Sequence, residues 1–125
     1  MRHRIAGKKI NRTKDQRKAL RRVMIKQLFE NNRIKTTRAK AEFIRSDAEK
    51  LITLAKNSIN ATDIEKVNAR RLAASSLADA DIVKKLFDDI GPRFENRNGG
   101  YTRMWKLGLR SGDSSEMVLL ELVEE

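Results

Sequence analysis

The sequence predicts an α+β fold, a two-layer α/β domain with about four helices packed on a small three-stranded sheet, preceded by an extended basic N-terminal arm. Two features of the pattern predict this class. Apolar residues recur at helical spacing through most of the chain, and after residue 100 they change to the alternation typical of strands. Because 125 residues fit one domain, we expect an arm over residues 1–13 and a single domain over residues 14–125.

The first helix is expected to begin after Thr13 and to end near Asn31. Thr13 can accept a hydrogen bond as the N-cap, and Asp15 lies in the first turn, where the helix dipole favours negative charge. The first half of the helix has basic side chains along one arc, whereas the second half is apolar nearly all round. We therefore expect the second half to enter the core and the first half to project outward with the arm.

A short β-branched segment, Arg33–Thr37, separates two helical patterns and is either a strand or a connection. Thr36 or Thr37 then caps a second helix that reaches about Lys56. Within this helix an arc of about 100° is apolar and predicts a stripe that faces the core: Ala41, Ile44, Ala48, Leu51, Ile52 and Ala55.

Two more helices are expected before residue 92. The segment Thr62–Glu65 has the spacing of a capping box at the start of the third helix. Asp79 or Asp81 begins the fourth, and Gly91 is expected to end it in a left-handed cap because Pro92 cannot continue a helix. The inward face of the fourth helix is expected to consist of Ile82, Val83, Leu86, Phe87 and Ile90.

A hairpin closes the chain. Residues 101–109 alternate in strand fashion, residues 110–116 form a turn, and the apolar run from Met117 to Val123 is the partner strand. A hairpin needs a third strand or a helical layer to be stable, so Arg33–Thr37 is expected to join it.

The positive charge is concentrated at one end of the chain. Residues 1–38 contain 14 Lys or Arg against Asp15 and Glu30, a net charge of +12, while the remaining 14 basic and 15 acidic residues sum to −1. Like charge concentrated in this way repels itself unless a polyanion neutralises it. The arm has too few apolar residues to insert into a membrane as an interfacial helix, which favours nucleic acid over a membrane surface.

The arm and the first half of helix one are therefore predicted to bind phosphate groups, against the alternative of a solvated terminus. Arg can bridge two phosphate oxygens, and Lys adds a point charge. The predicted RNA-binding residues of this region are Arg2, His3, Arg4, Lys8, Lys9, Asn11, Arg12, Lys14, Arg17, Lys18, Arg21 and Arg22.

A second basic patch is predicted around a Gly-Gly pair. Its glycines would let a backbone approach phosphate or ribose closely, and its aromatic residues can either stack on an unpaired base or pack in the core. For Trp105 we favour the core. Arg70 and Arg71 have no acid at helical spacing, which leaves both available for an outside anion. The predicted RNA-binding residues outside the arm are Lys35, Arg93, Arg97, Gly99, Gly100, Tyr101, Arg103 and Lys106.

The composition excludes several classes of protein. The chain has no cysteine and one histidine, so thiolate and histidine metal sites are excluded, and no apolar run reaches the roughly 20 residues of a membrane span. No P-loop, dinucleotide fingerprint or Ser/His/Asp set is visible. We expect no catalysis, no metal, no cofactor, no small-molecule substrate and no membrane partner. The basic N-terminus could also be a mitochondrial transit peptide, but the segment is not Ser-rich. We therefore favour a cytoplasmic protein.

Two other functions would also fit a chain with this charge pattern, a DNA-binding architectural protein and a nuclease. A DNA-binding architectural protein needs a groove-reading helix, and the only strongly basic helix has a second half that is predicted to be buried. A nuclease needs a metal or acid–base set, which the sequence lacks.

Three blocks of sequence occur in order along the chain: "RIKTTRAKAEFIR", "AEKLITLAKN" and "GPRFENRNGGYTRMWKLGLRSGD". With the opening "MRHR" and the final "ELV", they resemble the bacterial large-subunit ribosomal protein seventeen family over nearly the whole chain. The resemblance implies a structural constituent of the large ribosomal subunit that binds 23S rRNA near the peptide exit and contacts neighbouring large-subunit proteins. It also implies a two-layer α/β fold in which Arg33–Thr37 is a strand.

Overall fold

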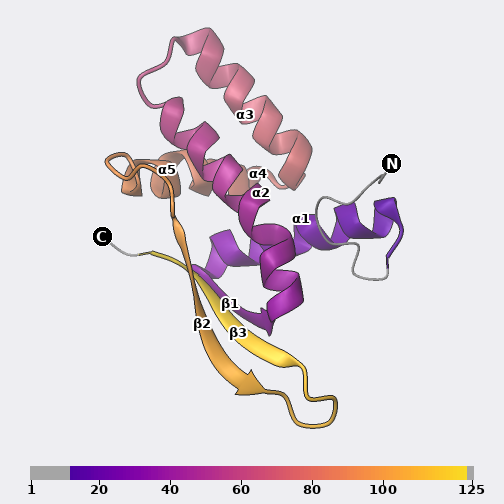
Figure 1. Ribbon diagram of the computed structural model, residues 1–125. Helices are drawn as coiled ribbons and strands as arrows, with labels where there is room; N and C mark the ends of the chain where they lie inside the picture. The colour runs from indigo at the N-terminus through magenta and orange to yellow at the C-terminus, as the bar shows by residue number, and fades with distance from the viewer. Residues whose placement is uncertain (1–11, 124–125) are drawn as a thin grey trace, which may run out of the picture.

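The predicted fold class is confirmed by a computed structural model, which describes residues 12–123 (Figure 1). Helices pack on a three-stranded antiparallel sheet in the order α1, β1, α2, α3, α4, η1, α5, β2, β3. The N-terminal arm that the sequence predicts lies outside the described residues, apart from its last two positions, Arg12 and Thr13.

The sheet joins the hairpin to the short strand after the first helix. Strands β1 (Arg33–Thr37), β2 (Thr102–Leu109) and β3 (Glu116–Leu122) lie in the order β1-β3-β2, so the last strand is central. Both pairings are antiparallel, and a bulge interrupts β2 between Lys106 and Gly108. Val118, Leu120 and Leu122 of β3 are buried on the face that packs against the helices.

Helix α1 (Lys14–Asn31) behaves as its two-part sequence predicts. Thr13 accepts a hydrogen bond from the Gln16 amide (3.2 Å), and the Gln16 side chain accepts one from the Thr13 amide (3.0 Å), which completes a capping box. All the buried side chains of the helix lie in its second half: Met24, Ile25, Leu28 and Phe29. The basic first half is therefore held outside the core.

Helices α2 (Arg38–Asn57) and α3 (Asp63–Leu77) also begin where the sequence predicts. Thr37 and Thr62 are their N-caps and accept hydrogen bonds from the amides of Lys40 and Glu65. Every member of the predicted apolar stripe of α2 is buried. Helix α3 buries smaller side chains, Ala69, Ala73 and Leu77.

The fourth helix does not end at Gly91, so that prediction was wrong. Helix α4 (Ala80–Lys85) continues through a π-helical turn, η1 (Leu86–Ile90), into a short helix α5 (Gly91–Arg93). Gly91 has a right-handed φ of −55°, and its amide donates to the carbonyl oxygen of Leu86, five residues earlier. The wider turn displaces the carbonyl that the ring of Pro92 would otherwise meet, so the helix continues past the proline. The role of Gly91 is close packing, since a Cβ there would lie 3.1 Å from the Cβ of Ala55.

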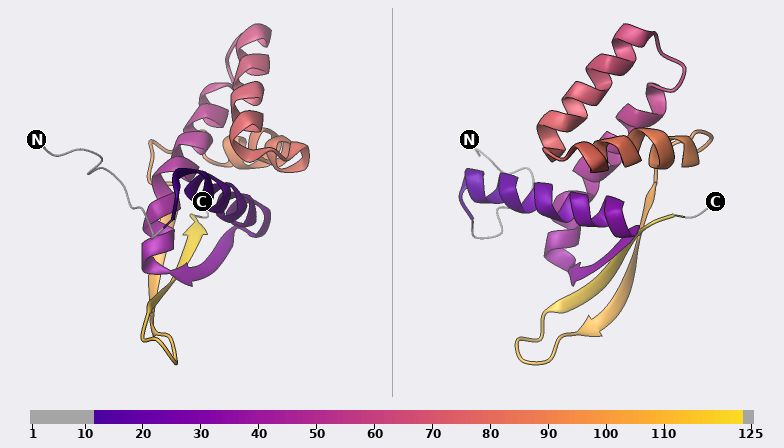
Figure 2. Two further views of the ribbon diagram at one scale, coloured as in Figure 1. Left: turned by 90° about the vertical axis from the view of Figure 1, so that its right-hand side faces the viewer. Right: turned by 180° about the vertical axis from the view of Figure 1, so that it is seen from behind.

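The views from the side and from behind show how the layers are arranged (Figure 2). Helices α1 and α2 contact the sheet, and α3 and α4 pack on α1. The tip of the β2–β3 hairpin extends beyond the helices at one end of the molecule, and α3 lies at the opposite end (Figures 1 and 2).

The N-cap of α4 leads to a prediction about pH. The Oδ1 atom of Asp79 accepts hydrogen bonds from the amides of Asp81 (3.1 Å) and Ile82 (3.3 Å), and its Oδ2 atom lies 3.5 Å from Lys26 Nζ. The Ile82 amide is the largest cause that lowers the pKa of Asp79 below its usual 3.8, and Lys26 adds to the effect. A carboxylate with a lowered pKa stabilises the fold above its unfolded pKa and loses that contribution as pH falls through its folded pKa.

We therefore expect Asp79→Asn, which keeps an acceptor oxygen and removes the charge, to lower the thermal midpoint near pH 7. The difference from the unchanged protein should shrink as pH falls below 3.8. Thermal unfolding followed by circular dichroism, from pH 7 to below pH 3.8, measures the difference in midpoint. Asp81→Asn, in the same turn, is the control. A difference that stays constant with pH would show that the charge of Asp79 is not involved.

Candidate nucleic-acid interface

The segment from Arg12 through the first half of α1 is strongly basic. Between Arg12 and Arg22 the chain has six Lys or Arg and one acid, Asp15. Lys14 and Lys18 are exposed and have no ion-pair partner among residues 12–123. The guanidinium of Arg17 donates to the carbonyl oxygen of Arg12 (2.8 Å), which ties the end of the arm to the helix. The predicted residues of this segment thus share one projecting element.

Two arginines of α1 are held in place by neighbouring helices. Arg21 Nε lies 2.8 Å from Asp47 Oδ2 on α2, and its guanidinium lies 4.9 Å from the centroid of the Phe43 ring. Arg22 donates from Nε and Nη2 to the carbonyl oxygens of Ser76 and Ser75 (3.1 and 3.3 Å), at the end of α3. These contacts fix the direction in which α1 leaves the core.

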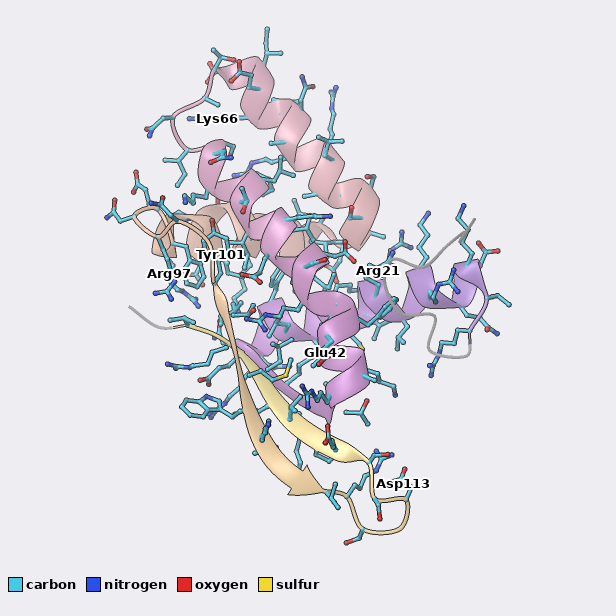
Figure 3. The ribbon with its side chains drawn as sticks, viewed as in Figure 1. Arg21, Glu42, Lys66, Arg97, Tyr101 and Asp113 are labelled. Carbon is cyan, nitrogen blue, oxygen red and sulfur yellow. The ribbon has the colours of Figure 1, made fainter. Side chains whose placement is uncertain are left out.

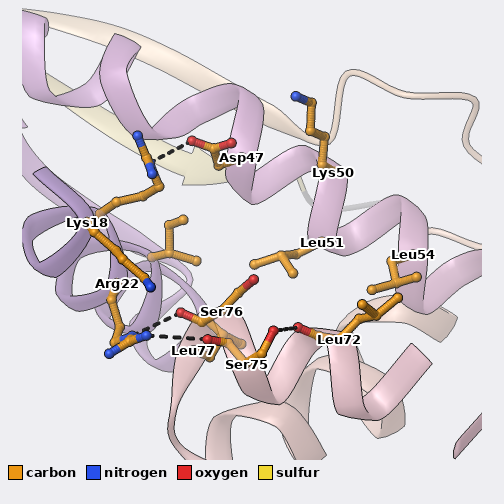
Figure 4. A pocket seen from close by; sticks show the side chains of 12 residues that line it. Lys18, Arg22, Asp47, Lys50, Leu51, Leu54, Leu72, Ser75, Ser76 and Leu77 are labelled. Atoms are coloured by element: carbon orange, nitrogen blue, oxygen red, sulfur yellow. Dashed lines mark hydrogen bonds and ion pairs between the residues drawn. The ribbon is translucent and has the colours of Figure 1, made fainter. Parts of the chain in front are cut away.

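A groove lies where these three helices meet (Figure 4). Its rim is basic, with Lys18 from α1 and Lys50 from α2, and Asp47 is the one acid in its lining. Lys50 is exposed and has no ion-pair partner within the described residues. The sequence prediction did not include Lys50, because helical spacing within α2 carries no sign that it lies beside α1. The floor is apolar: Ile25, Leu51, Leu54, Leu72 and Leu77.

The predicted Gly-Gly loop is present, but its tyrosine is not exposed. Gly99 and Gly100 both have positive φ angles, 94° and 61°, which glycine adopts without strain. The Gly100 carbonyl oxygen accepts a hydrogen bond from Arg97 Nε (3.1 Å). The Tyr101 side chain is 2% exposed, its ring packs on Phe94, and its hydroxyl lies 3.3 Å from the hydroxyl of Thr53. The ring of Tyr101 is thus part of the core and is not available for base stacking.

The other predicted cations outside the arm are spread over three elements, α5, β1 and β2. Arg93 donates to Asn32 Oδ1 (3.1 Å) and to Asp89 Oδ2 (3.0 Å), and Arg103 pairs with Glu121 (2.9 Å). Lys35 and Lys106 are exposed and have no ion-pair partner in the part of the chain that the structure describes. Figure 3 shows Arg21 and Arg97 on opposite sides of the molecule, so α1 and the Gly-Gly loop form separate patches.

Two predictions about single side chains were wrong. Arg70 is not available for an outside anion, because its Nη2 lies 2.9 Å from Asp88 Oδ1 and its guanidinium lies 5.0 Å from the centroid of the Phe87 ring. Trp105 is not in the core, since its side chain is 50% exposed. In β2 the even-numbered positions face the helices, as buried Thr102 and partly buried Met104 show. Trp105 therefore points to the opposite face.

Residues 12–123 contain neither a metal-binding cluster nor a membrane-spanning helix. No group of three or more His, Asp or Glu side chains within residues 12–123 could hold a metal ion. None of the helices in that range is both long and apolar enough to cross a membrane. Among the described residues, the exposed cations and the half-exposed indole of Trp105 are the features suited to contact a nucleic acid.

Comparison with known proteins gives a consistent result. A family model described as ribosomal protein L17 matches residues 19–123. The chain is 47% identical over 123 residues to the large ribosomal subunit protein bL17 of Desulforapulum autotrophicum. This alignment covers 98% of this chain and 97% of that protein. It is 49% identical over 117 residues to bL17 of Natranaerobius thermophilus, and the alignment covers 94% of this chain and 97% of that protein. A match of 48% over 124 residues to bL17 of Treponema denticola covers 99% of this chain and 65% of that longer protein.

Proposed function

The chain belongs to the ribosomal protein L17 family, and on that premise we propose that it is a structural constituent of the large ribosomal subunit that binds 23S rRNA. Its relatives are named as ribosomal proteins and not as enzymes, so no catalysis is expected. Neighbouring large-subunit proteins are its other expected partners. Binding would use the N-terminal arm, the first half of α1 and the exposed cations of the sheet and the Gly-Gly loop.

The observation that carries this proposal is the projecting first half of α1. Its cations lie on a helix whose second half is anchored in the core, so the domain holds them in a fixed direction. Lys14, Lys18 and Lys50 have no acidic partner among residues 12–123, which leaves their charge for phosphate groups. The rival architectural function is less well supported, because the buried half of α1 leaves a short exposed helix to enter a DNA groove.

Binding to rRNA should depend steeply on salt. If about six to ten phosphates are contacted, the affinity should fall by roughly 10³–10⁵ between about 50 and 200 mM salt, because each contact releases condensed counterions. Fluorescence anisotropy of a labelled large-subunit rRNA fragment at a series of salt concentrations measures the slope.

The same assay separates the rival functions. Unlabelled rRNA fragment should displace the labelled RNA more effectively than duplex DNA of equal phosphate content. A flat salt response would contradict the phosphate mechanism, and stronger competition by duplex DNA would favour the architectural protein. Loss of intact RNA on addition of magnesium would favour a nuclease.

A further inference from the structure

The outer face of the sheet, which points away from the helices, carries the exposed indole. Strand pairing places Arg33, Glu121 and Arg103 in one row across the three strands. It places Lys35, Leu119 and Trp105 in the next row. Side chains alternate between faces along a strand, so the six share the face opposite buried Leu120 and Leu122. We call these two rows the Trp105 face.

The ring of Trp105 is held in one orientation. Its Nε1–H donates to Glu121 Oε1 (2.6 Å), and the guanidinium of Arg103 lies 5.1 Å from the ring centroid. Arg103 also donates from Nε to the same carboxylate (3.0 Å), so the three groups hold one another. The hydrogen bond from Trp105 is the largest cause that lowers the pKa of Glu121, and Arg103 adds to it. The carboxylate therefore stays charged and keeps the ring fixed near neutral pH.

The surroundings of the ring are more basic than acidic. Arg33 and Lys35 are exposed on β1, and Arg103 is exposed beside the ring, while Glu121 is the one acid in these two rows. Lys35 stands two strands away from Trp105, about 9.5 Å across the sheet at the usual strand spacing. Leu119, between them, is partly buried and makes the middle of the row apolar.

We propose that the Trp105 face binds an unpaired segment of RNA, with one base stacked on the indole and the flanking phosphates on Lys35 and Arg33. This inference rests on the proposed rRNA-binding function and adds a site to it. Planar side chains on an open sheet are a recurring platform for single-stranded nucleic acid, because every base has a face that can stack. A paired A-form helix presents no free base face, so the site would select unpaired nucleotides.

A protein partner fits this face less well. The centre of a protein interface is depleted of charged residues, whereas here an arginine lies against the ring and two more cations lie across the sheet. Arg and Trp do occur at hot spots of protein interfaces, so the experiments below also include a protein partner.

Trp105 is the only tryptophan of the chain, so its fluorescence reports on this site directly. The full-length protein is titrated with a single-stranded RNA oligonucleotide and, separately, with a fully paired RNA of equal phosphate content at the same salt concentration. We expect the single-stranded RNA to quench the fluorescence strongly and the paired RNA to leave it nearly unchanged. Equal quenching by both, or none by either while both bind, would overturn the proposal.

Three variants test the contacts by anisotropy of labelled single-stranded RNA. Trp105→Leu should weaken binding roughly 5- to 150-fold, the range that corresponds to loss of one stacked base. Trp105→Phe keeps an aromatic ring and should recover most of the affinity. Lys35→Ala should reduce the slope of log affinity against log salt by about 1. The thermal midpoint of each variant is compared with that of the unchanged protein, so that a folding defect is not taken for a binding defect.

Failure of this site is distinguishable from failure of the rRNA-binding function. If Trp105→Leu binds the single-stranded RNA and the rRNA fragment as tightly as the unchanged protein, with the same salt dependence, the Trp105 face is not an RNA site but rRNA binding stands. If the unchanged protein binds neither RNA, the proposed function fails. Quenching by purified neighbouring ribosomal proteins and not by RNA would reassign the face to protein docking and overturn the proposal.

Discussion

Removal of residues 1–11 should lower the affinity for large-subunit rRNA by about 10³-fold near 0.1 M salt and reduce the salt slope by about 3 to 4 units. The segment holds four Lys or Arg, and each cation that neutralises a phosphate releases counterions on binding. The shortened chain should also be incorporated poorly into large subunits. Anisotropy with an rRNA fragment measures the affinity, and sedimentation of tagged protein with large subunits measures incorporation.

The same deletion should leave the thermal midpoint nearly unchanged. Thr13 and Gln16, which form the capping box of α1, remain in the shortened chain, and so does the Arg12 carbonyl oxygen that accepts from Arg17. Among residues 12–123, the buried core residues run from Met24 to Val123. Loss of affinity without loss of stability would therefore assign the deleted residues to binding.

A matched control removes the same charge elsewhere. Four cations belong to other helices than α1, have no ion-pair partner among the described residues, and can be changed to glutamine together: Lys40, Lys66, Arg71 and Lys84. If net charge alone governed binding, this variant would lose as much affinity as the deletion. We expect a much smaller loss, and equal losses would contradict a specific role for the arm.

Much of the fold could be predicted because its signals are local. The buried stripe of α2, the caps at Thr13, Thr37 and Thr62 and the two halves of α1 follow from residues within one helix. Arg33–Thr37 could be predicted as a strand only if it joined the hairpin, because its partner residues in β3 lie 80 to 88 residues later.

The predictions that failed depend on contacts between distant segments. The alternation in β2 does not show which side of the strand faces the helices, so the core position expected for Trp105 was wrong. Tyr101 precedes β2, and its turn into the core does not follow from the alternation of the strand. Arg70 finds its acid on η1, 18 residues away, and not at helical spacing. The basic rim of the groove needs Lys50 of α2 to lie beside α1. Binding surfaces are thus less visible in a sequence than the core, because they combine several elements.

Phe29→Ala should destabilise the protein by about 3–5 kcal/mol and lower its thermal midpoint by roughly 10–20 °C. Phe29 is fully buried near the end of α1, in the half of the helix that enters the core. Removing its ring loses apolar burial and leaves a cavity that a close-packed interior cannot fully fill. Chemical denaturation and thermal unfolding followed by circular dichroism measure the loss.

Phe29→Ala should also weaken rRNA binding, because Phe29 helps to anchor α1 in the core. The core half of α1 holds the direction of the basic half, so partial loosening of the helix should weaken rRNA binding even though no cation has been removed. Ile64→Ala, at an exposed position of α3 outside the groove, is the control and should change stability by no more than about 0.5 kcal/mol. If Phe29→Ala is destabilised as expected but, at temperatures well below its midpoint, binds rRNA with unchanged affinity, then the anchored direction of α1 is not needed for binding. In that case the charges of the helix act as a flexible cationic segment, and the projection of α1 from the core has no part in recognition.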